Sequence, residues 1–230
     1  SKLIIYKTIF LAIGSRTKPK DLYIPINYWL ITINKMETDL KILKTLLKDI
    51  SVKHTITSLA KEIGITRVGA WKILKKLNSD GLILLSQIGA GKTSTYSISL
   101  NWDNPITEKT LSLALTQDAI KNQRWRDNFV ELKNKTDFVI IYGSIIHSLK
   151  EANDIDILGV TSRNKFVEIE ESVKKIQKIQ TKKIHILNFT KEEFKQELEK
   201  PNKALIDAVK KGIILFGQEK FIDFIGGIRR

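Results

Sequence analysis

The chain has no cysteine, and among its 230 residues it has one methionine, three histidines and four prolines. Without cysteine there is no disulfide framework, no thiolate metal site and no cysteine nucleophile. The absence of disulfides fits the reducing cytoplasm, and we expect a cytoplasmic location. These absences exclude disulfide-stapled secreted domains and thiol chemistry.

The sequence also lacks a long hydrophobic run. The best candidate is LIIYKTIFLAI, residues 3–13, which is too short because a spanning helix needs about 20 apolar residues. Lys7 interrupts this run, and no small-residue cleavage site follows it. We therefore expect no signal peptide, no transmembrane helix and no membrane partner.

Acidic residues are scarce relative to basic ones. The chain has 39 Lys and Arg against 25 Asp and Glu, which gives a net charge of +14. Residues 1–101 contain sixteen basic and six acidic residues, so they carry +10 of that charge. A basic region of this kind favours a polyanionic partner, bound through phosphate contacts and counterion release. The alternative is a lysine-rich surface that is simply well solvated.

Two patterns divide the first 49 residues. Two apolar, β-rich runs, 3–13 and 22–33, flank GSRTKPKD, where Gly14 and Pro19 predict a break. We expect residues 1–35 to be an N-terminal extension that forms a strand–loop–strand hairpin. From Met36 the spacing of Leu40, Leu43 and Leu47 predicts an amphipathic helix over about 37–49.

Residues 55–100 contain two further helix signals and a hairpin. Thr55 is the predicted N-cap of a helix that ends at Gly64, and Thr66 that of a helix that stops at Gly81. LILLSQ, the glycine-rich IGAGKTS and TYSISL predict two strands joined by a turn. The stretch LAKEIGITRVGAWKILKKLNSDGLI resembles the winged helix-turn-helix domains of MarR- and ArsR-like transcription regulators. The resemblance implies a domain over 36–101 that binds double-stranded DNA.

In such a domain the helix over 66–79 would be the recognition helix. The apolar residues expected to face the other helices are Ala70, Ile73, Leu74 and Leu77. The residues expected to contact DNA are Thr66, Arg67, Val68, Trp71, Lys72 and Lys75 on the helix and Lys92 at the wing tip. Val68 and Trp71 would touch thymine methyls or sugars, and Arg67 a base edge or phosphate. The alternative for Trp71 is packing against another domain or a dimer mate.

Residues 102–135 are expected to form a helical linker after Asn104-Pro105. The apolar positions of this segment are Leu111, Leu115, Ala119, Trp125, Phe129 and Leu132. We expect the linker to join two domains and to support a homodimer, because a two-fold symmetric DNA site requires two copies of a reading head.

Residues 136–230 alternate between strand and helix patterns. DFVIIYG, DIDILGV and KKIHILN read as strands, with helical patterns between and after them. This indicates a small mixed-sheet domain. The expected fold class is therefore α+β or α/β, with two domains: a winged helix-turn-helix and this mixed sheet, preceded by the hairpin-like extension.

The stretch YGSIIHSLKEANDIDILG, residues 142–159, pairs Gly143-Ser144 with Asp154-Ile155-Asp156. In its strand–helix–strand context it resembles the minimal nucleotidyltransferases of the DNA polymerase β superfamily. The resemblance implies that Gly143 and Ser144 open a helix and hold nucleotide phosphates. It also implies that Asp154 and Asp156, on one face of a strand, hold Mg²⁺ or Mn²⁺ together with a nucleoside triphosphate.

One part of that catalytic set is missing. The family supplies a third carboxylate from the next strand, where this chain has His185 in KIHI. A histidine can accept a proton or bind a transition metal, but it brings no negative charge for Mg²⁺. The family's usual Arg-Gly after Gly-Ser is also absent, with His147-Ser148 in those places. We therefore expect weak or no nucleotidyl transfer, with Asp154, Asp156 and His185 as catalytic residues only if the domain is active.

Three functions remain open from the sequence. The first is a DNA-binding transcription regulator whose degenerate nucleotidyltransferase-like domain binds nucleotide or mediates assembly. The second is an active metal-dependent nucleotidyltransferase that modifies a protein or RNA. The third makes both domains protein-interaction modules, and the charge distribution argues against it.

Overall fold

The computed structural model of the chain describes residues 26–89, 95–200 and 202–229, with side chains from residue 37 onward. The chain divides into two units, residues 1–38 and residues 39–230. The described part of the first unit is the beginning of helix α2 (Ile26–Lys48), which continues into the second unit. No helix of the described residues, α2 included, is both long and apolar enough to cross a bilayer.

Helix α2 begins earlier than the sequence pattern indicates. The expected helix over 37–49 is confirmed, but the strand expected over 22–33 is wrong for residues 26–33, which are helical. No glycine or proline occurs between residues 26 and 63, so nothing in the chain separates the β-branched run from the strong helix formers after it. The first expected strand, residues 3–13, lies outside the described residues.

Two short helices follow with the caps that the sequence predicts. Helix α3 (Ile56–Ile63) starts at Thr55, whose hydroxyl accepts a hydrogen bond from the Ser58 N–H at 3.2 Å, and it ends at Gly64, where φ is 80°. Helix α4 (Arg67–Ser79) starts at Thr66, whose hydroxyl accepts from the Gly69 N–H at 3.0 Å. Each cap satisfies an N–H that the helix leaves unpaired.

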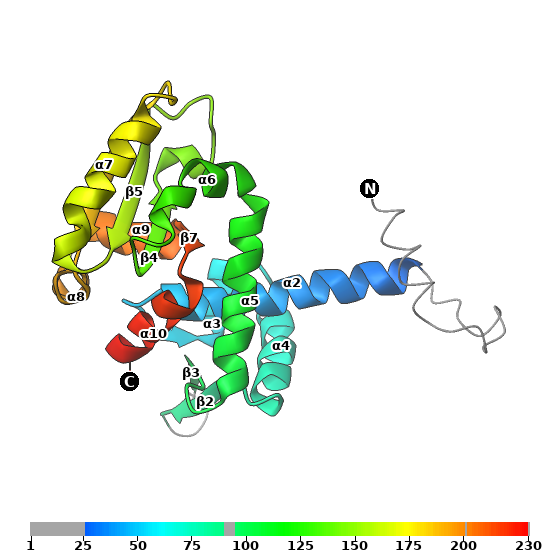
Figure 1. Cartoon of the computed structure of the whole chain (residues 1–230). Helices are drawn as coiled ribbons and strands as arrows, with labels where there is room; N and C mark the ends of the chain where they lie inside the picture. The colour runs from blue at the N-terminus through cyan, green and yellow to red at the C-terminus, as the bar shows by residue number, and fades with distance from the viewer. Residues whose placement is uncertain (1–25, 90–94, 201, 230) are drawn as a thin grey trace, which may run out of the picture. The chain divides into compact units, whose positions relative to one another are not determined.

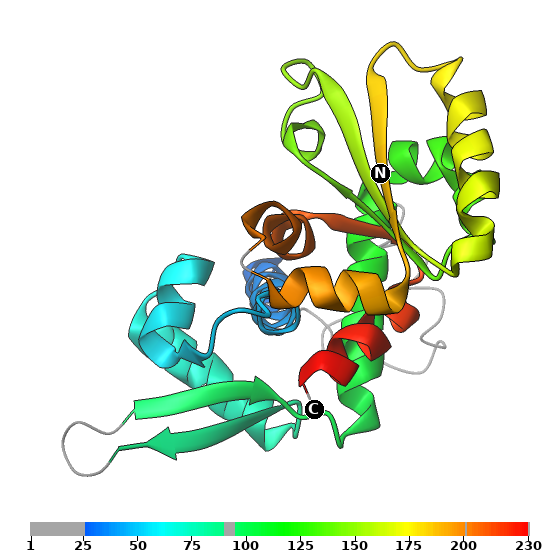
Figure 2. The ribbon, with the colours of Figure 1, turned by 90° about the vertical axis from the view of Figure 1, so that its left-hand side faces the viewer.

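A small antiparallel sheet packs beside these helices. Strands β2 (Ile83–Ile88) and β3 (Thr95–Leu100) form the expected hairpin, and a two-residue strand β1 (His54–Thr55) pairs with the other edge of β3. Figure 2 shows the hairpin extending beyond α4. The order β1-β3-β2 places the beginning of α3 directly against the hairpin.

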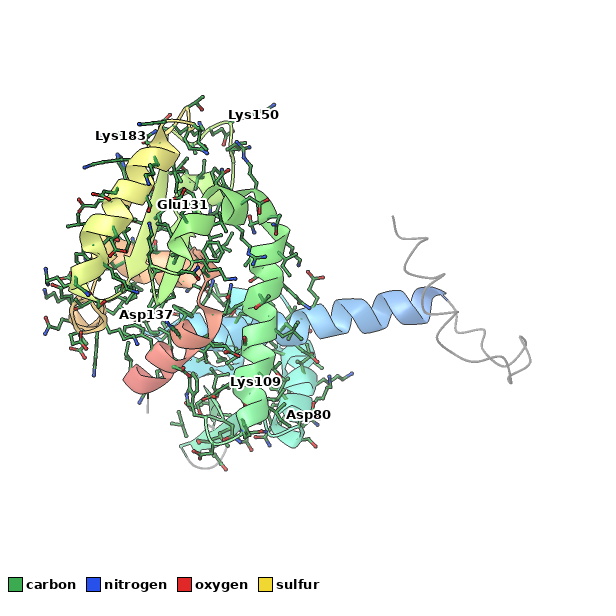
Figure 3. The ribbon with its side chains drawn as sticks, in the orientation of Figure 1. Asp80, Lys109, Glu131, Asp137, Lys150 and Lys183 are labelled. Carbon is green, nitrogen blue, oxygen red and sulfur yellow. The ribbon has the colours of Figure 1, made fainter. Side chains whose placement is uncertain are left out.

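The linker is helical, as expected. It contains α5 (Pro105–Lys121), α6 (Gln123–Asn128) and the 3₁₀ helix η3 (Val130–Leu132). The predicted apolar stripe is buried at every position: Leu111, Leu115, Ala119, Trp125, Phe129 and Leu132. Lys109 Nζ on α5 lies 3.0 Å from Glu219 Oε1 of the C-terminal helix. Figure 3 labels Lys109 on α5.

The second sheet has four strands in the order β6-β5-β4-β7. The strands are β4 (Phe138–Tyr142), β5 (Asp154–Val160), β6 (Lys183–Phe189) and β7 (Ile213–Phe216). The short helices are η4 (Ser144–Ile146) and η5 (Arg163–Lys165), and the longer ones are α7 (Phe166–Gln177), α8 (Lys191–Glu199), α9 (Lys203–Lys211) and α10 (Gln218–Arg229). Only β5 and β6 run parallel, joined by α7 as a crossover. The expected mixed α+β class is confirmed.

Alternation along the strands divides the core into two clusters. Val139 and Ile157 belong to the cluster beneath α6 and α7, whereas Phe138 and Leu158 belong to the cluster beneath α8, α9 and α10. The two views show helices on both faces of this sheet (Figures 1 and 2). The cluster beneath α8, α9 and α10 also contains the buried residues of α2 to β3. One continuous core therefore joins two halves of residues 39–230: the segment from α2 to β3, and the four-stranded sheet with its helices.

A buried ionic junction also joins the two halves. Asp49 is 2% exposed and lies 3.1 Å from His54 Nε2. Lys210 on α9 donates to the same carboxylate at 2.9 Å, and this hydrogen bond raises the pKa of Lys210. A carboxylate this deeply buried needs such partners, because an unpaired buried charge costs several kcal/mol.

Lys48 and Arg229 complete the junction with hydrogen bonds to carbonyl groups. The buried ammonium of Lys48 donates to the carbonyl of Gly212, 164 residues away in the chain. Burial lowers the pKa of Lys48 to about 8. Arg229 donates to the Leu46 carbonyl at 2.8 Å and to the Asp49 carbonyl. The end of α2 is thus held by the last two helices and the turn before β7.

Candidate metal centre and nucleic-acid interface

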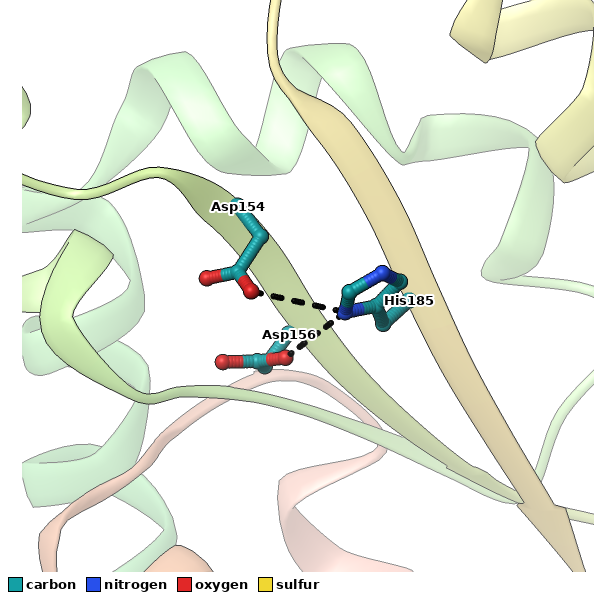
Figure 4. Close-up of side chains that lie close together, drawn as sticks. All are labelled: Asp154, Asp156 and His185. Carbon is teal, nitrogen blue, oxygen red and sulfur yellow. Dashed lines mark ion pairs between the residues drawn. The ribbon is translucent and has the colours of Figure 1, made fainter.

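The pairing of β5 and β6 brings three polar side chains together. Asp154 and Asp156 alternate with buried Ile155 and so lie on one face of β5. Leu158, farther along the same face, belongs to the core cluster beneath α8, α9 and α10. His185 on β6 is the register partner of Asp156. Figure 4 shows the two carboxylates and the imidazole converging from adjacent parallel strands. The three residues that the sequence singled out, Asp154, Asp156 and His185, therefore lie together in the fold.

The imidazole faces both carboxylates through the same nitrogen. His185 Nδ1 lies 3.5 Å from Asp154 Oδ2 and 3.6 Å from Asp156 Oδ1. One donor atom from each of the three residues lies within 4.8 Å of the others. These side chains are partly exposed, so the cluster is open to solvent and to an entering ligand.

The cluster carries uncompensated negative charge. Burial and the neighbouring charge of Asp154 raise the pKa of Asp156, and His185 acts in the opposite direction. Burial and both carboxylates also raise the pKa of Tyr142, the register partner of Asp156 on β4, to about 12. Within the described residues, the ion pairs of Asp154 and Asp156 are with His185 and with no lysine or arginine. The site is thus electrostatically disposed toward a cation.

Gly143 makes room for one of the carboxylates. Its φ of 79° is in the region that favours glycine, and a Cβ there would lie 2.4 Å from Asp156 Oδ2. The helix expected to begin at Gly143-Ser144 is absent: Ser144 starts the three-residue 3₁₀ helix η4. Only 143–153 connect the antiparallel strands β4 and β5, and η4 is the one helical turn among them. Exposed Ser144 therefore does not open a phosphate-binding helix.

The donors do not fit the two-magnesium centre that the family resemblance implies. Among the described residues, no third Asp or Glu joins Asp154, Asp156 and His185. Mg²⁺ takes oxygen ligands in near-octahedral geometry, and a pair of such ions needs bridging carboxylates to balance four positive charges. Two carboxylates and an imidazole supply too few anionic oxygens for that arrangement.

Most of the helix residues predicted to contact DNA lie on the face of α4 away from the core, but Trp71 is partly buried and packs against the core. Ala70, Leu74 and Leu77 are buried as expected, and Ile73 is partly buried. The exposed residues of the opposite face are Arg67, Val68, Lys72 and Lys75, with Thr66 as the N-cap. Lys92 lies outside the described residues. The side chain of Val68 is unusually open for valine, at 66% exposed.

Trp71 is placed between the helix and the hairpin. Its ring centroid lies 5.3 Å from that of Tyr96 on β3, and Lys75 Nζ lies 5.6 Å from the Trp71 ring. A groove of about 340 Å³ runs beside this pair, lined by Ile56, Arg67, Val68, Trp71, Thr95 and Tyr96. Tyr96 is a groove residue that sequence reasoning missed, because a strand pattern does not specify which residue of α4 lies across from it.

No family model, curated protein or solved structure matches the chain. The candidate sites are defined by two features of the described residues alone. One is the Asp154–Asp156–His185 cluster, and the other is the cationic, partly apolar face formed by α4 and β3.

Proposed function

We propose that the protein binds double-stranded DNA as a transcription regulator, with residues 36–101 acting as a winged helix-turn-helix domain. The observation that carries the proposal is the outward face of α4, where exposed Arg67, Lys72 and Lys75 lie beside a β-hairpin. A helix presented in this way has the dimensions to enter a major groove. The +10 charge of residues 1–101 supports a phosphate partner for the same half of the chain.

The groove between α4 and β3 favours a base or sugar contact in addition to phosphate contacts. Val68 and the edge of Trp71 supply apolar surface, and Arg67 stands at the N-terminal end of the helix. Apolar side chains at this position distinguish thymine by its methyl group, and an arginine can bond guanine through two acceptors. Tyr96 holds the Trp71 ring, so the groove is preorganised before DNA arrives.

A homodimer is part of this proposal. Ile106, Leu113 and Ile120 on α5 are 54–61% exposed and are spaced seven residues apart. In an antiparallel pair of α5 helices centred on Leu113, each Ile106 would face the Ile120 of a second copy. Seven-residue spacing is that of a coiled-coil seam. A solution mass of one chain would contradict this part of the proposal.

The test measures binding of a fluorescent duplex as a function of salt. Replacing Arg67 and Lys72 together by alanine should make the negative slope of log K against log salt shallower by up to about 1.8, since each phosphate contact contributes about 0.9. Trp71→Ala, which leaves the charge unchanged, should weaken binding at least tenfold at a single salt concentration. The matched control is the pair Lys174→Ala and Lys175→Ala, exposed on α7, which should leave the binding curve unchanged.

The proposal is refuted if both α4 variants bind duplex as the unaltered protein does. It is also refuted if the α7 pair lowers the salt slope as much as the α4 pair. That second result would mean that net charge, and not the recognition face, accounts for binding.

The convergence of Asp154, Asp156 and His185 favours a second candidate, metal-dependent nucleotidyl transfer to a protein or RNA. Under the leading proposal, the domain over 136–230 instead binds nucleotide or mediates assembly. Incubation with labelled nucleoside triphosphates, Mn²⁺ or Mg²⁺ and candidate acceptors separates the two. Label transfer that is lost in Asp154→Asn and Asp156→Asn would establish the second function.

A further inference from the structure

We infer that Asp154, Asp156 and His185 bind a single divalent transition-metal ion, of the Zn²⁺ class, in preference to Mg²⁺. The inference does not depend on DNA binding or on nucleotidyl transfer. It follows from the donor set and its geometry, which differ from the all-carboxylate magnesium pair that the family resemblance implies.

The spacing of the donors matches one ion. Protein ligands lie about 2.0–2.2 Å from Zn²⁺, and donors in a tetrahedral or octahedral shell are then about 3.0–3.5 Å apart. His185 Nδ1 lies 3.5 Å from Asp154 Oδ2 and 3.6 Å from Asp156 Oδ1. These separations exceed the 2.7–3.2 Å of an N–H···O hydrogen bond. The two carboxylate donors lie within 4.8 Å of each other, and rotation of the Asp side chains would bring all three donors around one ion.

The backbone fixes this arrangement. Asp154 and Asp156 are on one face of β5, and the parallel register sets His185 beside Asp156. On the other side Gly143 has no Cβ that would push the Asp156 carboxylate away. Two strands and a glycine turn therefore hold the three donors, so a metal would bind without refolding of the loop.

The identity of the donors selects the metal class. Imidazole nitrogen is a good ligand for Zn²⁺, whereas carboxylates and water suit Mg²⁺ and Mn²⁺. Two carboxylates and one imidazole balance the charge of one divalent ion and leave further positions for water or substrate. A second ion would find no further Asp, Glu or His of the described residues in the cluster.

The experiment titrates the metal-free full-length protein with MnCl₂, ZnCl₂ and MgCl₂ by calorimetry, and follows free Mn²⁺ by electron paramagnetic resonance. We expect one ion per chain, with Zn²⁺ bound at least 100-fold more tightly than Mg²⁺. His185→Ala should weaken that binding at least tenfold. His185→Asp should reduce the discrimination against Mg²⁺ at least tenfold, because it replaces nitrogen by a carboxylate. Asp207→Asn, an acid on α9 that pairs with Lys211 and lies outside the cluster, is the control and should bind as the unaltered protein does.

Three results would overturn the inference: equal affinity for Mg²⁺ and Zn²⁺, two ions per chain, or unchanged binding in His185→Ala. Because His185 is 46% exposed, its replacement should not unfold the protein, and an unchanged melting temperature verifies this. DNA binding measured on the same samples keeps this test separate from that of the proposed function.

Discussion

Replacing Lys48 by methionine should stabilise the protein at neutral pH, although it removes a hydrogen bond. The pKa of Lys48 is lowered from 10.5 to about 8 by burial. A difference of 2.5 units corresponds to about 3 kcal/mol of stability that the protonated amine costs below pH 8. Losing the hydrogen bond to the Gly212 carbonyl costs about 1 kcal/mol. The expected net gain is therefore about 2 kcal/mol at pH 7.

The pH dependence of this effect has a definite sign. Between pH 8 and 10.5 the unfolded chain binds more protons at Lys48 than the folded chain, so the stability of the unaltered protein rises relative to that of Lys48→Met. Above pH 10.5 both states hold a neutral amine, and only the lost hydrogen bond remains. The variant should then be less stable by about 1 kcal/mol.

Urea unfolding at pH 7, 9 and 10.5, read by circular dichroism, measures the difference in unfolding free energy at each pH. The control is Lys109→Met, which removes an exposed lysine paired with Glu219 and should leave the stability nearly unchanged at every pH, because solvent screens an exposed ion pair. If Lys48→Met is destabilising at pH 7, or if its effect does not change between pH 7 and 10.5, then the ammonium is not held in an apolar environment as the fold implies.

Two further substitutions test the junction and the metal cluster. Lys210→Met should lower the unfolding free energy by about 3 kcal/mol because it leaves the buried Asp49 carboxylate with one partner fewer. The control, exposed Lys211→Met, should cost under about 1 kcal/mol. Similar losses for both variants in urea unfolding would count against the junction. Gly143→Ala should lower the stability by about 2 kcal/mol through its positive φ, and it should also weaken Zn²⁺ binding. Gly227→Ala, whose Cβ would meet no atom within 4 Å, should do neither. Thermal melts measure the change in stability, and calorimetry measures the change in metal binding.

Local signals in the sequence predicted much of the fold. The hydroxyls of Thr55 and Thr66 and the glycine at 64 mark helix ends through contacts within three or four residues, so they can be recognised without a structure. The strand alternation at Asp154 and Asp156 likewise depends on neighbouring residues alone. These predictions are confirmed because no tertiary contact competes with them.

The errors have a different physical origin. Residues 26–33, part of the apolar run expected to be a strand, are instead the beginning of a longer helix, because β propensity is weaker than continuity with strong helix formers. The helix expected after Gly143 is replaced by a single 3₁₀ turn, since the loop must return to an antiparallel neighbour within eleven residues, 143–153.

Long-range contacts could not be predicted from the sequence. The contact of Asp49 with Lys210 joins residues 161 positions apart, and His54 reads as part of a polar loop until β3 is seen to pair with it. The contact between Trp71 and Tyr96 depends on how the hairpin lies against α4. Such pairs are set by the packing of whole elements and leave no periodic trace in the chain.

The bonds from Lys48 to Gly212 and from Arg229 to Leu46 have a consequence for the protein's evolution. A recombination event that exchanged one half for that of a distant relative would separate each donor from its acceptor and leave the buried ammonium of Lys48 without its carbonyl partner. Substitutions at one end of the gene are therefore expected to restrict those tolerated at the other.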